Sequence, residues 1–404
     1  MNLTLALSLA EVKFGTSTRA VISDSEVTAE TGDITIDALS DGSVDSLGVA
    51  VGVSFGGAGA VSGSVAAAGA IASITSTNLV EALIDDGSDV DATLGSVLLT
   101  ATDKTEFTND VYGVSVAGSF AGGGSVAVAV AYAQSSVSLD GTVRTRISDS
   151  DVDAKLDVRQ TALADSKITS NGKGVALSLS AAAGFSLAGA GAGAIVNNTI
   201  GQTVEAGILA SNTDESQGVT AGGAVVVKAT DSIHSTADAT AASVSISAGY
   251  VAGALAISAA QASNTLAGST SAVIDNSLVR ANTGELTVSA NSESELFATP
   301  DAYAISAAIG FGGAAAGAGA SGTNTVTRTT KAQVRNNSDA RALGTTAAGV
   351  LTVEAHDKLK ATAEVNAASV SAGLSAMAAG IALAENTITS TTTASVEDST
   401  VQSA

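Results

Sequence analysis

The stretch Gly174–Ser211, GVALSLSAAAGFSLAGAGAGAIVNNTIGQTVEAGILAS, decides the fold class of this chain. It carries no charge from Gly174 to Val204. Within it, Leu187–Ala194 would place alanines on one side and glycines on the other in an extended chain, because side chains of a strand alternate between its faces. From Ile200 onward, larger aliphatic residues return on one face with polar residues between them, which is typical of a half-buried strand. The stretch therefore indicates β-structure.

Relatives of this stretch recur along the whole chain with a period of about 62 residues. One aliphatic residue anchors each copy, at Ile22, Ile84, Ile147, Ile208, Ile274, Val334 and Val396. Two residues later stand Asp24, Asp86, Asp149, Ala210, Asn276, Asn336 and Asp398, followed by Ser25, Gly87, Ser150, Ser211, Ser277, Asn337 and Ser399. Short polar side chains that tolerate left-handed φ angles predict a turn at this point of every copy.

A second landmark, an aliphatic strand that ends in alanine, repeats with the same period at Ala38, Ala101, Ala162, Ala229, Ala290 and Ala355. Each unit is predicted to contain a small-residue strand, an Asn-Thr-aliphatic corner, an aliphatic strand, the polar turn and a strand with a charged face. A unit could form three short coils of about 20 residues or two wider ones. We expect three, in an all-β, elongated parallel β-solenoid of about seven repeats that occupies residues 1–404 as one continuous array, truncated at both ends.

The composition suits thin, closely spaced sheets. Apolar residues make up 45% of the 404 residues but aromatic residues only 3%, with 43 Gly, one Pro, no Trp and no Cys. Helices are disfavoured, because each interior glycine of Leu187–Ala194 would cost about 1 kcal/mol in a helix. Several uncharged runs would be long enough to span a membrane, but they alternate with period two and are diluted with Gly, Ser, Thr and Asn, so a membrane-spanning chain is not expected.

The charge balance is strongly acidic. Thirty-nine acidic residues against 17 basic residues give a formal net charge of −22. This balance excludes nucleic acid as the expected partner, since phosphate binding needs a basic stripe. It favours solubility and mutual repulsion in a crowded exterior layer.

The repeat unit resembles those of giant bacterial cell-surface adhesins and haemagglutinin-like exoproteins. The residues that carry the resemblance are small-residue strands such as Val126–Ala131, the Asn-Thr pairs and the Asp-Ser turns. The resemblance covers the whole chain. It implies export, an extracellular or bacterial cell-surface location, and a structural stalk or filament segment that is adhesive or forms a biofilm matrix.

Two groups of polar residues are candidate sites. An Asn stands ten residues before the anchor in four copies, at Asn198, Asn264, Asn324 and Asn386, which predicts a structural amide ladder along one edge of the stack. Acidic residues cluster near two turns, at Asp86, Asp89, Asp91, Asp149, Asp151 and Asp153. Clustered carboxylates are the ligands that calcium prefers, but solvated turns explain them more simply, and no other cofactor is expected.

Other partners and activities have weaker support. No catalytic role is expected, because the chain lacks Cys and its two histidines, His234 and His356, fall at different phases of the repeat. A basic group of Arg328, Lys331, Arg335 and Arg341 could meet an anionic cell-surface glycan, although neighbouring acids balance it more simply. Ice binding would require a regular Thr-x-Thr array, and the best stretch, Thr387–Thr393, has no counterpart in the other copies. The remaining partners are neighbouring repeats and copies of the chain itself, in a self-assembling fibre.

The glycines of Leu187–Ala194 lead to a specific hypothesis. Since both faces of this segment are small, we expect both to be closely covered, one by the solenoid wall and the other by another sheet or chain. Gly189, Gly191 and Gly193 would then form a lateral packing surface. On this hypothesis, Gly191→Val disturbs packing severely.

Overall fold

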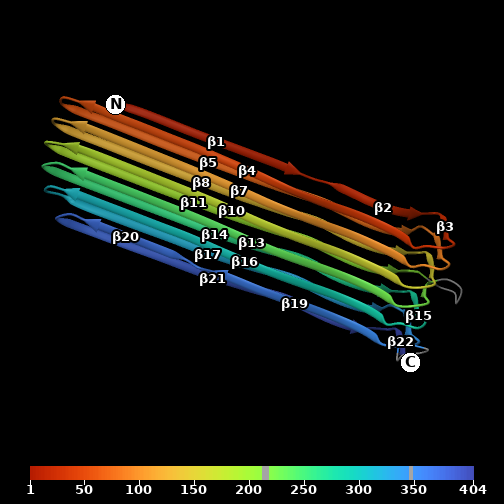
Figure 1. Cartoon of the computed structure of the whole chain (residues 1–404). Coiled ribbons are helices and arrows are strands. Elements are labelled where there is room, and N and C mark those ends of the chain that lie inside the picture. Colours follow the sequence, from red (N-terminus) through yellow and green to blue (C-terminus); the bar gives the residue numbers. More distant parts are fainter. Residues whose placement is uncertain (212–217, 345–348) are drawn as a thin grey trace.

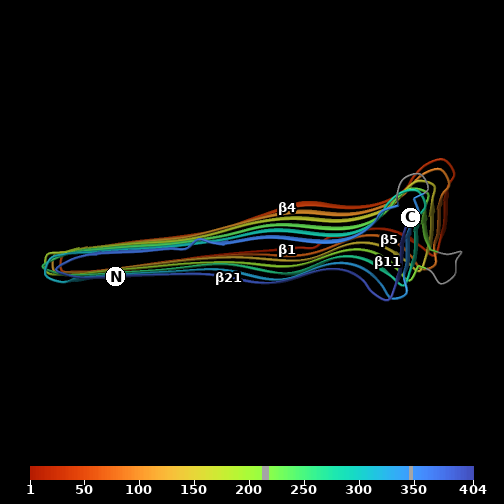
Figure 2. The same cartoon turned by 90° about the horizontal axis from the view of Figure 1, so that it is seen from below.

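The computed structural model describes residues 1–211, 218–344 and 349–404, which form a flat stack of parallel β-coils (Figure 1). Two long sheets face each other over the length of this flat stack, which we call the blade, and a short third sheet closes one end, as the view from below shows (Figure 2). The hairpin-like turns that join the two long sheets lie at the opposite, thin end. The prediction of an all-β parallel solenoid is confirmed.

Three sheets contain all the strands of the described residues. The first long sheet contains β1 (Asn2–Phe14), β2 (Ser17–Ser23), β5 (Val61–Asp85), β8 (Gly124–Ser148), β11 (Phe185–Leu209), β14 (Val251–Asp275), β17 (Gly313–Arg335) and β21 (Ser375–Val396). The second long sheet contains β4 (Ile34–Ala58), β7 (Val97–Ala121), β10 (Val158–Ala182), β13 (Val225–Ala248), β16 (Leu286–Ile309), β19 (Leu351–Ala363) and β20 (Asn366–Ala372). The short sheet contains β3 (Glu26–Ala29), β6 (Asp89–Ala92), β9 (Asp151–Ala154), β12 (Val219–Ala221), β15 (Leu278–Ala281), β18 (Asp339–Ala342) and β22 (Thr400–Ser403).

One repeat makes one coil, so the expectation of three coils of about 20 residues is wrong. The chain runs along β8, crosses the short sheet in β9, returns along β10, and turns at Ala183-Gly184 into β11, which pairs in register with β8. A strand such as β10 continues for 25 residues, because no proline or left-handed turn interrupts it. The changes of composition within a repeat mark different depths along one strand, not separate strands.

The anchors of the repeat align in a single row across the stack. Ile147 pairs with Ile84 on one side and with Ile208 on the other, and the row continues through every coil. The landmark alanines form a second row, in which Ala162 pairs with Ala101 and Ala229. The period and phase predicted from the sequence are therefore the register of the sheets.

The predicted polar turn adopts a left-handed conformation in every copy. The φ angle is positive at Asp24, Asp86, Asp149, Ala210, Asn276, Asn336 and Asp398, between 46° and 57°. Two copies have a second positive φ angle, at Gly87 and Asn337, so their turns are one residue longer. The alignment of those two residues with the turn serines is wrong for that reason, because Ser88 and Ser338 occupy the serine position.

Ala210 is the one turn residue of this row whose side chain cannot compensate for a left-handed backbone, with φ at 50°. The left-handed region costs about 1–2 kcal/mol for an ordinary L-residue and less for asparagine. We expect Ala210→Asn to raise the free energy of unfolding by about 1 kcal/mol, measured by denaturant titration. Ala210→Val is the matched comparison and should lower it, and equal stability of the two variants would contradict this account of the turn.

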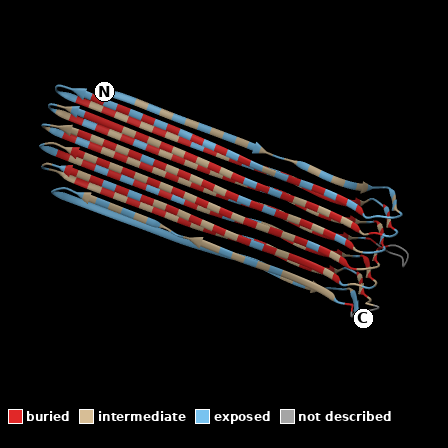
Figure 3. Ribbon diagram, in the orientation of Figure 1, coloured by how far each residue is buried: buried red, intermediate tan, exposed pale blue. Residues whose placement is uncertain are grey.

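The core changes in composition along the blade, while buried and less buried residues alternate along the whole length of the inner strands (Figure 3). Where the short sheet closes the coil, inward residues are Val, Ile and Leu, for example Ile147, Val152 and Val158. Toward the thin end they are mostly alanine, such as Ala129, Ala192 and Ala241. Small inward side chains let the two long sheets approach each other, which explains why the blade thins in Figure 2.

The closest approach between the long sheets occurs at two glycines of the second long sheet. A Cβ atom added to Gly174 would lie 2.2 Å from the carbonyl oxygen of Gly193, and one added to Gly113 would lie 2.2 Å from that of Tyr132. Gly113 and Gly174 are neighbours in adjacent coils. Glycine is thus required at these positions for backbone to meet backbone across the interior.

The longest dimension lies along the strands. A strand of 25 residues is about 80 Å long, whereas seven coils spaced about 4.8 Å apart advance only about 30 Å along the solenoid axis. The described residues therefore form a plate that is wider than it is long in the direction of stacking.

Candidate functional site

The predicted asparagine ladder is present and runs directly from coil to coil. Asn198 Nδ2 donates to Asn264 Oδ1 at 3.1 Å, Asn264 to Asn324 at 2.8 Å, and Asn324 to Asn386 at 2.8 Å. The expectation that other coils separate the rungs is wrong, because each repeat is a single coil. Stacked amides of this kind satisfy one another between neighbouring strands.

The ladder lies between the sheets and not at a corner of the coil. Asn198 sits within the continuous strand β11 and is almost fully buried, so the predicted Asn-Thr corner is wrong. The amide nitrogens of Asn198, Asn264 and Asn324 also donate to carbonyl oxygens of the facing sheet, at 3.0, 2.8 and 2.8 Å. A buried amide needs such partners, and here they join the two long sheets.

Asn109 makes the same connection from the opposite sheet. Its Nδ2 donates to the carbonyl oxygens of Ala72 at 3.0 Å and Ser136 at 3.2 Å. Sequence analysis missed it because Asn109 lies in a different phase of the repeat and has no counterpart there in the other copies. Only the facing of the two sheets brings it to the level of the ladder.

Removing one rung should destabilise the stack. Asn264→Ala takes away partners of Asn198, Asn324 and the carbonyl of Phe297, and each buried group left unpaired costs about 1–3 kcal/mol. We expect the free energy of unfolding to fall by about 3 kcal/mol in chemical denaturation. Ser263→Ala, at the adjacent outward position, is the control and should have a much smaller effect.

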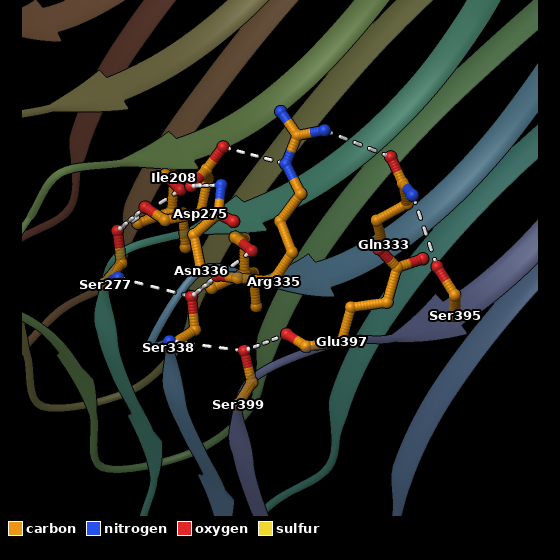
Figure 4. Close-up of polar contacts among 11 residues, drawn as sticks. Ile208, Asp275, Ser277, Gln333, Arg335, Asn336, Ser338, Ser395, Glu397 and Ser399 are labelled. Atoms are coloured by element: carbon orange, nitrogen blue, oxygen red, sulfur yellow. Dashed lines mark hydrogen bonds and ion pairs between the residues drawn. The ribbon is translucent and has the colours of Figure 1, made fainter.

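A second ladder, of serines, follows the polar turns, and Figure 4 shows three of its rungs. The amide nitrogen of Ser277 donates to Ser338 Oγ at 3.3 Å, and that of Ser338 to Ser399 Oγ at 3.3 Å. Each hydroxyl in turn donates to a backbone carbonyl of its own turn, as Ser277 Oγ does to Asp275 at 2.7 Å. The complete ladder contains Ser25, Ser88, Ser150, Ser211, Ser277, Ser338 and Ser399. These turns therefore serve to hold the coils in register.

The fold brings four of the six calcium candidates together on the short sheet. Asp89 pairs with Asp151, and Asp91 with Asp153, on the adjacent strands β6 and β9. Asp86 and Asp149 lie apart from them, in the left-handed turns. Within residues 1–211, 218–344 and 349–404, no three acidic, His or Cys groups converge closely enough to hold a metal ion. The paired carboxylates thus form a charged surface without metal-binding geometry.

Stacking perturbs two of these carboxyl groups. Burial raises the pKa of Asp151, against a hydrogen bond from the Gly218 amide, and the charge of Asp89 adds to the rise. Burial likewise raises the pKa of Asp153, and the charges of Asp151, Asp91 and Asp89 raise it further. Crowding of like charges between adjacent strands is the consequence of repeating an acidic residue in register.

A buried ion pair crosses the interior near the middle of the blade. Arg328 Nη2 lies 2.7 Å from Asp231 Oδ2, and both side chains are at most 3% exposed. Arg328 also donates to Ser294. Burial raises the pKa of Asp231 to about 6, Arg328 opposes this rise, and the nearby Asp357 adds to it. Two sheets contribute to this pair, which is not repeated in the other described coils.

This raised pKa makes stability depend on pH in an unusual direction. Between the ordinary value of 3.8 and about 6, the folded chain holds a proton on Asp231 that the unfolded chain has released. The free energy of unfolding should therefore rise as the pH falls from about 6 to about 4, and melting curves across this range would measure it. Asp151 and Asp153 act in the same direction, so the Asp231→Asn variant is needed to isolate the contribution of Asp231. A variant with the same pH slope as the parent chain would contradict the assignment.

Most of the other candidate residues from the sequence form ion pairs with nearby side chains. Three of the four residues of the basic group are in ion pairs, Arg328 with Asp231, Arg335 with Asp275 at 2.8 Å, and Arg341 with Asp339. The two histidines lie on the surface and each is 3.5 Å from a glutamate, His234 from Glu295 and His356 from Glu354. The interpretation that nearby acids balance these cations is confirmed for the three arginines.

The glycines of Leu187–Ala194 face outward, while the alanines between them face the second long sheet. An added Cβ atom at Gly191 would meet no other atom within 4 Å. The expectation that both faces are covered is therefore wrong within the described part of this chain, because only the alanine face has a partner. A severe effect of Gly191→Val on packing therefore remains a prediction only for the contact of this face with another molecule.

Comparison of the chain with protein-family models, with curated protein sequences and with solved structures gives no match. Among the residues described here, no helix is long and apolar enough to cross a membrane.

Proposed function

We propose that this chain is a structural scaffold segment of a large secreted bacterial surface protein, in which it builds a stalk, filament or matrix. The observation that supports this proposal is the continuity of the ladders. Within the described residues, the anchor row, the serine ladder and the backbone pairing pass through every coil, and none of these coils is specialised to hold a ligand. A stack in which each repeat contacts only its neighbours suits mechanical continuity.

The width of the coil favours a matrix-forming ribbon over a thin spacer. Every coil advances about 4.8 Å whatever its circumference. A coil of about 62 residues uses roughly three times the chain that a coil of about 20 residues would need for the same length. The additional residues build two broad lateral faces, which serve a role in which the sides of the structure make contacts.

Immunogold electron microscopy of the source cells, with antibodies raised against this chain, tests the proposal. Label along fibres or a matrix outside the cell envelope is the expected result. Label confined to the cell interior would rule out the surface role. Preimmune serum and cells that lack the coding sequence are the matched controls.

Ice binding is a second candidate, because the Thr-x-Thr array extends over two strands. Thr325, Thr327 and Thr329 of β17 pair in register with Thr387, Thr389 and Thr391 of β21. The statement that the stretch has no counterpart in another copy is therefore wrong. Thermal hysteresis of the purified chain, lost in the double variant Thr327→Lys and Thr389→Lys but kept in Thr28→Lys, would support this function. Absence of thermal hysteresis in the parent chain would eliminate it.

A further inference from the structure

At the thin end of the blade, small residues lie inside and large aliphatic residues lie outside, which is the reverse of an ordinary globular protein. The interior of this end contains alanines and serines, with Ser115 Oγ donating to the carbonyl of Ala66 at 2.8 Å and Ser178 Oγ to that of Ala127 at 2.8 Å. Large aliphatic residues at the same end of the blade point outward, and Leu255 and Ile257 of β14 are 47% and 53% exposed. Exposed apolar surface of this extent marks a site of interaction.

No charge interrupts this surface. The uncharged runs of the sequence all cross the thin end, where they supply the ends of the second long sheet, the turns and the beginnings of the first long sheet: 46–80, 111–139, 174–204, 239–274, 302–327 and 365–384. The acidic residues behind the net charge of −22 are thus segregated to the other end of the blade. Two such thin ends can meet without bringing their carboxylates into contact.

The outward face of the first long sheet is corrugated here, and we call it the ridged face. Ridges of large residues lie on alternate strands, with Leu3, Leu5, Leu7 and Leu9 in β1, Val126, Val128, Val130 and Tyr132 in β8, Val251, Leu255 and Ile257 in β14, and Met377, Ile381 and Leu383 in β21. Troughs of mostly small residues lie between them, with Gly63, Ala67 and Gly69 in β5, Gly189, Gly191 and Gly193 in β11, and Gly313, Ala315, Gly317 and Gly319 in β17. Val65 and Leu187 are large residues on the trough strands, and Gly253, Ala259 and Ala379 are small residues on the ridge strands. In the central row, Leu5, Ala67, Val130, Gly191, Ile257 and Gly317 alternate large and small across six coils.

The troughs are open. An added Cβ atom at Gly191, Gly317 or Gly319 would meet nothing within 4 Å. A hollow of about 450 Å³ lies between Leu7 and Val130 over the first trough, and another of about 400 Å³ lies between Ile195 and Ile381, over the last trough and across Ala259 of β14. Ridges and troughs therefore alternate with a period of two coils, which is about 9.6 Å.

We propose that the ridged face binds the ridged face of a second copy of this chain, with the ridges of each copy seated in the troughs of the other. A two-fold axis along the strands keeps both thin ends together and reverses the order of the coils, and an offset of one coil then places three of the four ridges of each copy opposite the three troughs of the other. The same patch is used on both copies, as in an isologous dimer. This pairing deepens the proposed scaffold function, on which it rests, by naming its lateral contact.

The area of the ridged face is sufficient for a specific interface. Nine residues at about 3.3 Å each and six overlapping strands about 4.8 Å apart give on the order of 800 Å² per copy. A standard protein interface buries about 800 Å² on each partner. The largest apolar patch of a typical monomer is only about 300–600 Å².

Variants that fill the troughs separate this proposal from other uses of an apolar face. Gly191→Leu combined with Gly317→Leu adds apolar surface without a clash inside the chain, so it should strengthen nonspecific aggregation or lipid binding but block the seating of ridges. Gly201→Leu is the matched control, because it lies outward on the same strand beyond the ridged face and an added Cβ there has only an ordinary contact, 3.7 Å from Asp140. Circular dichroism and melting curves verify that all variants fold.

Sedimentation velocity of the full chain over a range of concentrations measures the outcome. We expect the parent chain and Gly201→Leu to form dimers or larger even-numbered species, and the trough-filled variant to remain monomeric. A monomeric parent chain, or a trough-filled variant that associates as well as the parent, overturns the proposal. Flotation of a monomeric parent chain with phosphatidylcholine vesicles also overturns it, since the face then belongs to lipid. If the chain forms dimers but the source cells show no extracellular fibres, the scaffold function alone is contradicted. If the cells show fibres but the chain does not pair through the ridged face, only the proposed lateral contact is contradicted.

Discussion

Gly174→Val is expected to lower the free energy of unfolding by about 3 kcal/mol or more, because overpacking a closely packed interior costs about 1–3 kcal/mol and more where backbone must move. The first added carbon would already lie 2.2 Å from the carbonyl oxygen of Gly193 in the facing sheet. Neither long sheet can yield easily, since each strand there is hydrogen-bonded to neighbours in two adjacent coils. Urea denaturation followed by circular dichroism measures the change.

Gly191→Val is the matched control, with the same substitution in the same uncharged run, 174–204. Its added atoms have open space, so we expect a change within about 0.5 kcal/mol, typical of surface positions. The comparison is made at a dilution at which the chain is monomeric. Equal and large losses in both variants would contradict the assignment of the alanine face as the inside and the glycine face as the outside.

Arg328→Leu is expected to destabilise the chain by about 3–5 kcal/mol at pH 7.5, because it leaves Asp231 buried without its partner. The loss should shrink as the pH falls toward about 6, since Asp231 without Arg328, which lowers its pKa, takes up a proton at a higher pH than in the parent chain and no longer needs a counter-charge. Melting temperatures at several pH values measure this dependence.

The double variant Arg328→Leu with Asp231→Leu provides the control for this pair. Replacing both partners of a buried ion pair by apolar residues is often neutral or stabilising. We expect it to recover most of the stability lost in Arg328→Leu and to lose the associated pH dependence. A double variant as unstable as the single one would show that the arginine acts through packing and not through its charge.

Much of the strand register could be predicted, because the repeat period of the sequence sets which residues of successive coils are paired. The anchors Ile147 and Ile208 had to align once the copies were stacked, and the asparagines ten residues earlier then had to meet. The left-handed turns could also be predicted from the sequence, since Asp, Asn and Gly tolerate a conformation that other residues avoid. These inferences require only local chemistry and repetition.

The number of coils per repeat could not be predicted, because it depends on where a strand ends. The shift from small residues at Ala194 to Asn198 and then to Ile200 looks like a boundary between elements, yet the strand continues through it. The shift follows the distance between the two facing sheets, which increases along the blade. That distance is a property of two strands together and is absent from the pattern of either one.

The pairing of Arg328 with Asp231 illustrates the same limit, since 97 residues separate them and no other copy has an arginine at the position of Arg328. By itself, the sequence determined the period, the parallel β-class, the turns and the alternation of alanine with glycine in Leu187–Ala194. Only the tertiary structure decided that the alanines face a partner sheet, that the glycines face outward, and that large and small residues of successive coils form ridges and troughs. The physical reason is that alternation along a strand defines two faces, whereas the facing of a second sheet defines which of them is buried.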